Sequence, residues 1–225
     1  MHGGQLACKV IKLPSGSREK LHREMGILSK MPSHPNIVKL YKSTESKNNL
    51  YLFMEYCDVG DLKQFVKRRF KSGRLGEEEA RYVMRDVIRG LCQMSDVCQV
   101  MHRDLKLENI LVKSKHPEAA AISDFEFKIG DMGLAKGHSG DHLLYGTICG
   151  SPLYMAPEVL LNQPYNHSAD IWSLGTMLYH LLTGNYPFDA STLTQLKKNV
   201  QLGVYWIPKS VRLSYEVIQF LNCCL

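Results

Sequence analysis

The segment His102-Arg103-Asp104-Leu105-Lys106-Leu107-Glu108-Asn109 decides how the rest of the chain is interpreted. It places a carboxylate, an ammonium and an amide within six residues, on what we expect to be a loop. Phosphoryl transfer needs an aligned hydroxyl, neutralised phosphate oxygens and a magnesium ion held in place. Asp104 could act as the base, Lys106 could offset the negative charge of the γ-phosphate, and Asn109 offers a hard oxygen to Mg²⁺. A polar loop with incidental charges is the alternative interpretation.

A second carboxylate and a lysine extend this candidate site. Asp131 opens the triplet Asp-Met-Gly, 22 residues after Asn109 and directly after an expected strand, so it is a candidate second magnesium ligand. An Asp-x-Gly triplet alone is a common turn, but its distance from the first segment favours the ligand. Lys9 alternates with apolar neighbours, and Glu24 follows fifteen residues later on an expected helix. Such a pair would hold an ammonium against nucleotide phosphates, whereas a lone Lys9 would be an edge-strand lysine facing water.

Hydrophobic periodicity predicts a mixed chain, with strands mostly before residue 55 and helices after residue 60. Strands are expected at residues 6–13, 37–41, 50–54 and 127–129. Helices are expected at residues 16–28, 77–97, 169–183, 193–202 and 215–225. The segment 169–183 is apolar nearly all round, which is typical of a helix buried on every side. Residues 114–126 are expected to form a surface insertion, and residues 136–150 a long polar loop.

Composition is that of an ordinary globular protein. The 225 residues are 44% apolar, 22% charged and 9% aromatic, enough for a sizeable core. The net charge of +6 suits anionic ligands without implying nucleic acid, and the basic cluster at residues 63–74 is expected to be a solvated helical face. The longest apolar stretch falls short of a membrane span, and no secretory signal opens the chain. The seven cysteines lack the spacing of a disulfide framework or a zinc site and are expected to be free thiols. From these observations we predict a cytoplasmic protein without an integral membrane segment.

Taken together, these motifs resemble the protein kinase superfamily over essentially the whole chain. Ala7-Cys8-Lys9 resembles its third-strand lysine motif, Glu24 its helix-C partner, residues 102–109 its catalytic loop and residues 131–133 its magnesium-binding triplet. Ala156-Pro157-Glu158 resembles the end of its activation segment, and residues 170–175 the start of its buried F helix. The resemblance implies a two-lobed α+β fold. Residues 1–55 would be a partial N-terminal lobe of a strand, helix C, two strands and the hinge, and residues 56–225 a partial helical C-terminal lobe carrying the catalytic loop and the activation segment.

The resemblance also implies where ATP and Mg²⁺ bind. Met54 matches the gatekeeper, Glu55 and Cys57 the hinge that offers backbone groups to adenine, Leu111 the floor under the base, and Asp61 the ribose contact. The full set implied for ATP is Ala7, Lys9, Glu24, Glu55, Cys57, Asp61, Glu108, Leu111 and Asp131. The implied catalytic residues are Asp104, Lys106 and Asn109, and the implied metal ligands are Asn109 and Asp131.

The resemblance further implies protein substrates. Lys106, together with residues 150–154 (Gly-Ser-Pro-Leu-Tyr), is similar to the serine/threonine branch. Residues 54–57 and 149–158 most resemble the autophagy-initiating kinases, with calcium/calmodulin-type kinases as near neighbours. Thr147 matches a common phosphorylation position, for which Arg103 would supply the cation, although an unmodified loop threonine is the alternative. The sequence does not identify a regulatory partner.

Three features depart from the family pattern. Only eight residues precede Lys9, so the first two strands and their glycine-rich phosphate loop are expected to be missing, as is the last helix at the other end. Glu158 would then lack its usual arginine partner, and Met132 replaces the usual phenylalanine. The missing phosphate loop supports a second hypothesis, a pseudokinase-like binding or scaffolding module without efficient phosphotransfer. The retained Lys9, Asp104 and Asp131 favour the enzyme.

Overall fold

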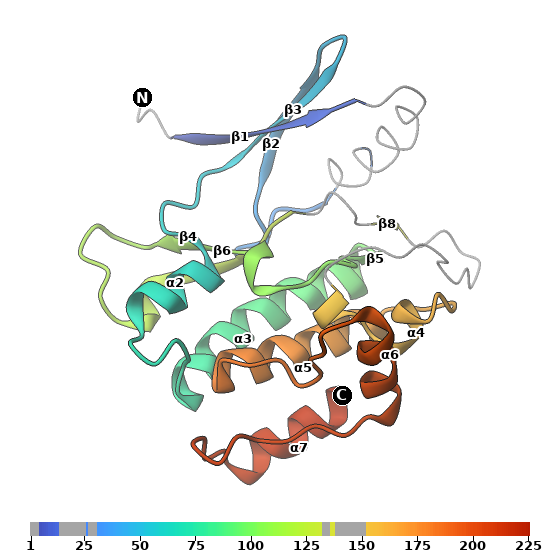
Figure 1. The fold of residues 1–225 in the computed structure, drawn as a ribbon. Helices are drawn as coiled ribbons and strands as arrows, with labels where there is room; N and C mark the ends of the chain where they lie inside the picture. Colours follow the sequence, from blue (N-terminus) through green and yellow to red (C-terminus); the bar gives the residue numbers. More distant parts are fainter. Residues whose placement is uncertain (1–4, 14–25, 27–30, 132–135, 138–151) are drawn as a thin grey trace.

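The computed structural model describes residues 5–13, 26, 31–131, 136–137 and 152–225. Figure 1 shows a small twisted sheet at one end and a group of packed helices at the other, with further short strands between them. The small sheet is antiparallel and has the order β1-β3-β2. Its strands are β1 (Leu6–Lys12), β2 (Leu40–Glu45) and β3 (Asn49–Glu55). The family's α+β fold is thereby confirmed.

Alternation along β1 decides which way its lysine faces. Ala7, Lys9 and Ile11 lie on the more buried face of the strand, whereas Leu6 and Val10 lie on the exposed face. Lys9 stands opposite Leu52 of β3, which is itself buried. Successive side chains of a strand point to opposite faces of the sheet, so Lys9 faces the same side as Ala7 and Ile11. Lys9 therefore faces inward, although β1 is an edge strand.

The prediction of a strand at residues 37–41 was wrong in its bounds, because β2 begins at Leu40. Ile37 and Val38 are buried, and they contact a different sheet. The Val38 amide donates to the Ile129 carbonyl at 2.9 Å, and the Ile129 amide donates to the Asn36 carbonyl at 2.8 Å. These apolar residues join the small sheet to the rest of the molecule. The expected helix at residues 16–28 lies outside the described residues except for Gly26, which is helical.

A second sheet lies next to the helices and has the order β4-β6-β7. Its strands are β4 (Gly60–Asp61), β6 (Ile110–Ser114) and β7 (Phe125–Ile129), so the strand expected at 127–129 starts two residues earlier. Between β6 and β7, where the sequence predicts a surface insertion at residues 114–126, runs a mostly exposed loop with a short 3-10 turn, η3 (Ile122–Asp124). A two-stranded pair joins β5 (Val100–Met101) to β8 (Lys136–Gly137), so the expected loop at 136–150 begins with a strand.

The helices follow the predicted periodicity closely. The long ones are α2 (Leu62–Arg69), α3 (Glu77–Cys92), α5 (Ser168–Thr183), α6 (Leu193–Leu202) and α7 (Tyr215–Cys224). A π-helical turn, η1 (Gln93–Val97), continues α3 to the end of the predicted segment. Shorter turns are η2 (Leu107–Asn109), η5 (Pro152–Tyr154) and α4 (Pro157–Leu160).

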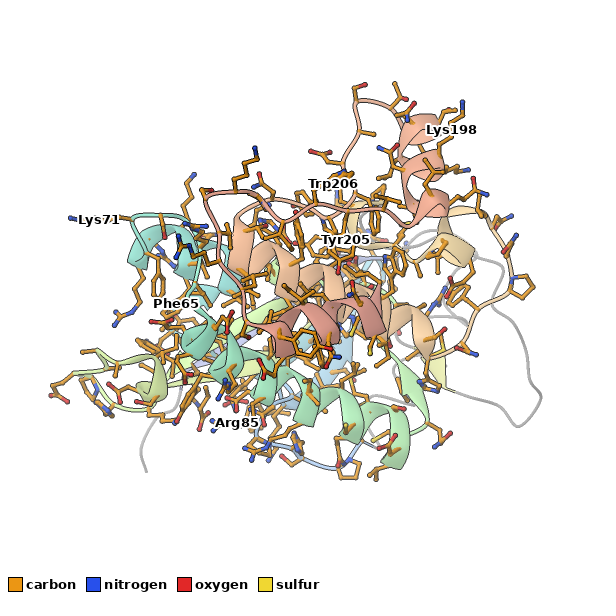
Figure 2. All side chains as sticks on the ribbon, turned by 90° about the horizontal axis from the view of Figure 1, so that it is seen from below. Phe65, Lys71, Arg85, Lys198, Tyr205 and Trp206 are labelled. Carbon is orange, nitrogen blue, oxygen red and sulfur yellow. The ribbon has the colours of Figure 1, made fainter. Side chains whose placement is uncertain are left out.

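Helix α5 forms the centre of the helical part, as its uniformly apolar sequence predicts. Leu174, Met177 and Leu181 belong to one large core, and Trp172 stacks on Phe188 in a second core cluster with ring centroids 5.4 Å apart. Figure 1 shows α5 between α3 and α7. In Figure 2 the basic side chains Lys71, Arg85 and Lys198 extend to the periphery. Within the described residues, no helix is both long and apolar enough to cross a membrane.

Candidate active site

The loop that carries Asp104 is anchored by a buried carboxylate in the first turn of α5. Asp170 is 3% exposed and accepts hydrogen bonds from the backbone amides of His102, at 2.8 Å, and of Arg103, at 2.9 Å. Arg103 adopts a left-handed backbone conformation with φ 70°, which is uncommon for residues other than glycine. Two charge-assisted hydrogen bonds thus hold the loop in a conformation that it would not adopt alone.

His102 links this loop to the segment that ends in Asp131. The side chain is fully buried, and its Nε2 lies 2.9 Å from the Gly130 carbonyl oxygen. Its Nδ1 accepts from the Asp104 amide at 3.3 Å, so we assign the ring proton to Nε2. The Gly130 amide in turn donates to the Asn109 carbonyl at 2.8 Å. The two motifs, more than twenty residues apart in sequence, therefore lie side by side.

The three predicted catalytic residues meet at one carboxylate oxygen. Lys106 Nζ lies 2.8 Å from Asp104 Oδ2, and Asn109 Nδ2 lies 3.0 Å from the same oxygen. Asn109 Nδ2 also donates to the Asp104 backbone carbonyl at 2.7 Å. The side chains of Asp104 and Lys106 are 12% and 20% exposed, so their attraction is only partly screened by water. The arrangement fixes the carboxylate beside a cation.

Lys9 contacts Asp131 directly. Its ammonium donates to Asp131 Oδ1 in an ion pair that joins the small sheet to the end of β7. Asp131 also has a left-handed backbone, with φ 48°. A Cβ on Gly130 would lie 3.1 Å from Leu111 Cγ, so a glycine here lets the chain pass close to β6 before it turns at Asp131. The edge-strand alternative for Lys9 is excluded by this contact.

The oxygens of Asn109 and Asp131 fit a magnesium ion. Because Asn109 Nδ2 is held by Asp104, the amide is oriented with Oδ1 as its acceptor atom, and Oδ1 makes no hydrogen bond within the described residues. Mg²⁺ in proteins usually takes one or two carboxylate or carbonyl oxygens, together with water and substrate phosphates. The described residues contain no larger group of His, Cys, Asp and Glu side chains that could hold a metal ion.

The residues implied for adenine lie along β1, β3 and β6. Ala7 stands opposite Met54 in the β1–β3 ladder, and Leu111 stands opposite Asp61 in the β4–β6 ladder. Ala7 and Leu111 are each half-buried. Cys57 is buried, and burial together with the nearby Glu55 carboxylate raises the pKa of its thiol to about 11. This cysteine is therefore a neutral packing residue in the segment after β3.

Three of the residues implied for ATP have carboxylates that are already engaged. Glu55 pairs with Lys113 at 2.7 Å and with Lys128 at 3.3 Å; burial opposes its ionisation, but these two lysines prevail and lower its pKa. Asp61 caps α2 by accepting from the Gln64 amide at 2.9 Å. Glu108 pairs with Lys63 at 2.7 Å. Burial likewise opposes the ionisation of Glu108, and the hydrogen bond from Lys63 is the main reason that its pKa is nevertheless lowered.

The model of the family described as protein kinase domain matches residues 2–225. The chain belongs to the protein kinase domain family. Its similarity to serine/threonine-protein kinase ATG1a of Arabidopsis thaliana is 40% identity over 183 residues, which cover 81% of this chain and 27% of the relative.

Other relatives of this kinase carry names of the same type. The probable cell cycle serine/threonine-protein kinase CDC5 homolog of Encephalitozoon cuniculi is 36% identical, over 98% of this chain and 45% of its own length. Human serine/threonine-protein kinase ULK1 is 37% identical, over 87% of this chain and 18% of its own length. The kinase thus spans less than half the length of these curated relatives. The two relatives ATG1a and ULK1 confirm the predicted likeness to the autophagy-initiating kinases.

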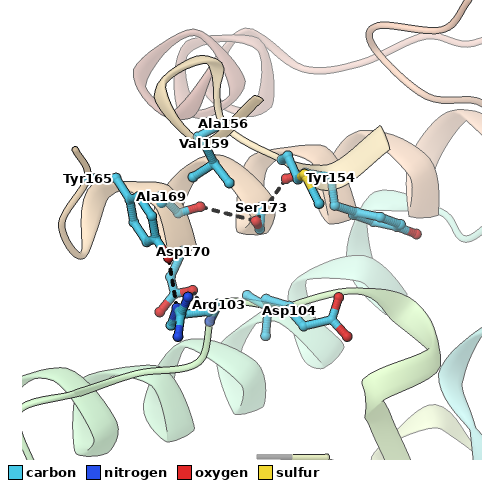
Figure 3. Close-up of a pocket in the computed structure, with 11 residues that line it drawn as sticks. Arg103, Asp104, Tyr154, Ala156, Val159, Tyr165, Ala169, Asp170 and Ser173 are labelled. Atoms are coloured by element: carbon cyan, nitrogen blue, oxygen red, sulfur yellow. Dashed lines mark hydrogen bonds between the residues drawn. The ribbon is translucent and has the colours of Figure 1, made fainter. Parts of the chain in front are cut away.

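Sequence reasoning missed a small cavity of about 20 Å³ beside Asp104 in this kinase. Figure 3 shows its lining, which includes Asp104 and Tyr154, with Tyr165 next to Arg103. Arg103 Nε donates to the Tyr165 hydroxyl at 2.8 Å, and the guanidinium lies 5.7 Å from the ring centroid. Tyr165 lies in the segment Gln163-Pro164-Tyr165, which carries no motif, so no local signal marked it. Glu24, Met132 and Thr147 lie outside the described residues.

Proposed function

We propose that this kinase transfers the γ-phosphoryl group of ATP to serine or threonine hydroxyls of protein substrates. The observation that carries the proposal is the convergence of Lys106 and Asn109 on the Asp104 carboxylate, beside the ion pair of Lys9 with Asp131. The names of the relatives, all serine/threonine-protein kinases, support the same activity and acceptor. Nothing in the site favours the alternative of a pseudokinase-like module.

In this proposal, Asp104 is the base. The substrate hydroxyl loses its proton to the Asp104 carboxylate, its oxygen forms a bond to the γ-phosphorus, and the bond between that phosphorus and the β–γ bridging oxygen breaks to release ADP. Lys106 is close enough to Asp104 to neutralise charge on the transferred group as well as on the base. When bound, Mg²⁺ supplies charge neutralisation to the phosphates, and Asn109 Oδ1 and Asp131 are the proposed ligands.

We propose the remaining positions as the nucleotide site. Lys9 binds phosphate oxygens, with Glu24 as its partner on helix C, while Ala7 and Leu111 cover the two faces of adenine. The backbone of Glu55 and Cys57 pairs with the adenine edge. The ribose lies near Asp61 and the start of η2 at Glu108. Residues 1–55 and 56–225 form the two lobes, and phosphorylation of Thr147 places a phosphate near Arg103.

The free thiols among the described cysteines are consistent with a cytoplasmic location, which we retain as a prediction.

Phosphotransfer by the wild-type chain and by Asp104→Asn tests the catalytic proposal. With Mg²⁺-ATP and a mixture of serine-containing peptides, we expect the variant to lose at least about 100-fold in turnover, the lower end of general-base effects. Asp189→Asn, which removes an exposed carboxylate that only caps its neighbour Ala190, is the matched control and should leave turnover unchanged. Nucleotide binding without any transfer by the wild-type chain would instead support the binding module.

A further inference from the structure

Residues 190–215, which comprise α6 and the loop that leads to α7, carry positive charge without any negative charge. They contain no Asp or Glu, and their basic side chains are Lys197, Lys198, Lys209 and Arg212. With four basic and no acidic residues, the segment contributes +4 to the net charge of +6. None of these four side chains forms an ion pair within the part of the chain that the structure describes. The segment is therefore a basic surface that attracts anions.

Three apolar side chains project from the same segment. Leu202, Val204 and Trp206 are 73%, 58% and 80% exposed. Single exposed apolar residues are ordinary on protein surfaces, but a tryptophan is usually well buried, and here three such side chains fall within five residues. We call these three residues the apolar patch. In sequence, the patch lies between the lysines of α6 and the basic residues that precede α7.

The neighbours of Trp206 hold it in this outward position. Burial alternates along residues 204–207, as in an extended strand, and Tyr205 and Ile207 are the two residues turned inward. The Tyr205 ring packs edge-on against Tyr179, with ring centroids 5.7 Å apart, and Ile207 packs against the large core. The Tyr179 hydroxyl also donates to the Trp206 carbonyl at 2.6 Å. The backbone that carries the indole is thus fixed, with the indole facing solvent.

The basic residues lie close enough to the apolar patch to contact the same external surface. Lys198 and Leu202 are four residues apart on α6 and share one face of the helix. Trp206 follows Leu202 by four residues, a length of chain that spans at most about 14 Å. Figure 2 shows Lys198 and Trp206 in the upper part of the view, on α6 and on the loop after it. One broad anionic surface can therefore meet both side chains at once.

An anionic lipid bilayer fits this combination better than an acidic protein does. Tryptophan is enriched at the boundary between lipid and water, and lysine is attracted by anionic headgroups while its stem covers apolar surface. The apolar patch projects outward, so it can enter a soft lipid surface that has no fixed shape. A protein partner would need a matching hollow for the indole, because protein interfaces are packed as densely as protein interiors. The cations flank the patch on both sides in sequence, which suits headgroups that move laterally.

We propose that residues 197–212 form a membrane-docking surface. The apolar patch enters the headgroup region of an anionic lipid bilayer, and the flanking lysines and arginine bind the charged headgroups. This inference goes beyond the proposed phosphotransfer and does not depend on it.

Vesicle binding tests the proposal. The chain is mixed with vesicles of phosphatidylcholine that contain about 30% phosphatidylserine, or with vesicles of phosphatidylcholine alone, and bound protein is separated by flotation. We expect the affinity for the anionic vesicles to be at least about tenfold higher, and to fall as salt is added, because salt screens exposed charges. Trp206→Ala should lower that affinity about tenfold or more, since it removes much of the apolar area that enters the lipid.

Two double variants that remove equal charge locate the contact. Lys198→Gln, Lys209→Gln should lose about 25-fold in affinity for the anionic vesicles, since each lysine near such a surface contributes about a factor of five. Lys67→Gln, Lys71→Gln removes the same charge near the end of α2 and should bind like wild type. Figure 2 shows Lys71 on the other side of the molecule from Lys198. All four lysines are exposed, so both variants should keep the wild-type Tm.

Fluorescence shows whether Trp206 itself enters the lipid. The chain has two tryptophans, and the other, Trp172, is 9% exposed and stacked on Phe188. Anionic vesicles should therefore shift the emission to shorter wavelength through Trp206, and phosphatidylcholine with brominated chains should quench the shifted emission. Trp206→Phe keeps an apolar ring, so it should still bind the vesicles but show neither the shift nor the quenching.

Several outcomes would each overturn the proposal. They are absence of binding to the anionic vesicles, equal affinity for the neutral ones, an equal loss in the two double variants, and an unshifted emission of vesicle-bound protein. Absence of vesicle binding together with retention on immobilised polyglutamate would assign the surface to an acidic protein instead. None of these measurements uses ATP, so their failure is distinct from a failure of the proposed phosphotransfer.

Discussion

Replacing Asp170 by asparagine is the sharpest test of how the catalytic loop is held. The carboxylate is 3% exposed and accepts from the His102 and Arg103 amides at 2.8 and 2.9 Å. In Asp170→Asn the side chain keeps its shape, but only one of its two terminal atoms is still an acceptor. One backbone amide therefore faces an NH₂ group, and the other donates to a neutral oxygen in place of a charged one.

The loss of stability expected for Asp170→Asn follows from these two hydrogen bonds. A hydrogen bond to a charged group contributes about 1.5–3 kcal/mol, and a buried amide left without a partner costs about 1–3 kcal/mol. We expect a total loss of about 3 kcal/mol, which lowers Tm by about 6–12 °C in a protein of this size. Catalysis should fall by about 100-fold, because a displacement of about 1 Å at a catalytic group has that effect.

Thermal unfolding and phosphotransfer, measured on the same preparations, check both expectations. Ser173→Ala is the matched control, one turn further along α5: Ser173 is 8% exposed, and its hydroxyl donates to the Tyr154 carbonyl at 2.9 Å. Loss of this neutral contact should cost only about 1 kcal/mol. An Asp170→Asn variant with Tm and turnover close to those of Ser173→Ala would refute the assignment of Asp170 as the anchor.

Three further variants probe packing, pH and nucleotide binding. Gly175→Ala should destabilise the protein by about 2 kcal/mol in denaturant unfolding, because the new Cβ would lie 2.5 Å from Cys224 Cβ; an unchanged midpoint would contradict the α5–α7 packing. Glu55→Gln should lower Tm at neutral pH. Lys113 and Lys128 lower the pKa of Glu55 in the folded protein below 4.5, so the ionised carboxylate stabilises the fold above that pH. This stabilisation is lost as the pH falls through the lowered pKa. The difference in Tm between Glu55→Gln and wild type should therefore vanish in acid. Lys9→Met should weaken ATP binding about tenfold or more in equilibrium titration, and equal affinity would exclude Lys9 from the phosphate site.

The sequence predicted the helices better than the strands, for a physical reason. The segment at 169–183 is apolar on all sides, and a helix buried on all sides is the arrangement that satisfies it. Ile37 and Val38 are also apolar, but the surface that buries them is β7, almost ninety residues later. A local pattern indicates that such residues are buried and does not reveal their partner, so the strand was placed three residues too early.

In the candidate site, too, the sequence predicted the residues of local motifs but not the contacts between distant segments. The motif residues Lys9, Asp104 and Asp131 were found because their spacing is specific, and the structure brings each of them into the same neighbourhood. The contacts of Tyr165 with Arg103 and of Lys63 with Glu108 were not found. Each depends on two segments at least 45 residues apart, and in neither pair do both residues belong to one motif.

Backbone strain explains why the anchoring contacts matter as much as the motif. Among the described residues, non-glycine left-handed conformations occur at four positions, and two of them, Arg103 and Asp131, lie in the candidate site. Such conformations persist only when surrounding contacts enforce them. For Arg103 the enforcing contact is the Asp170 carboxylate, and for Asp131 it is the paired Gly130 segment with His102 and Asn109. A chain that kept Lys9, Asp104 and Asp131 but lost Asp170 would thus lose the geometry on which the proposed base depends.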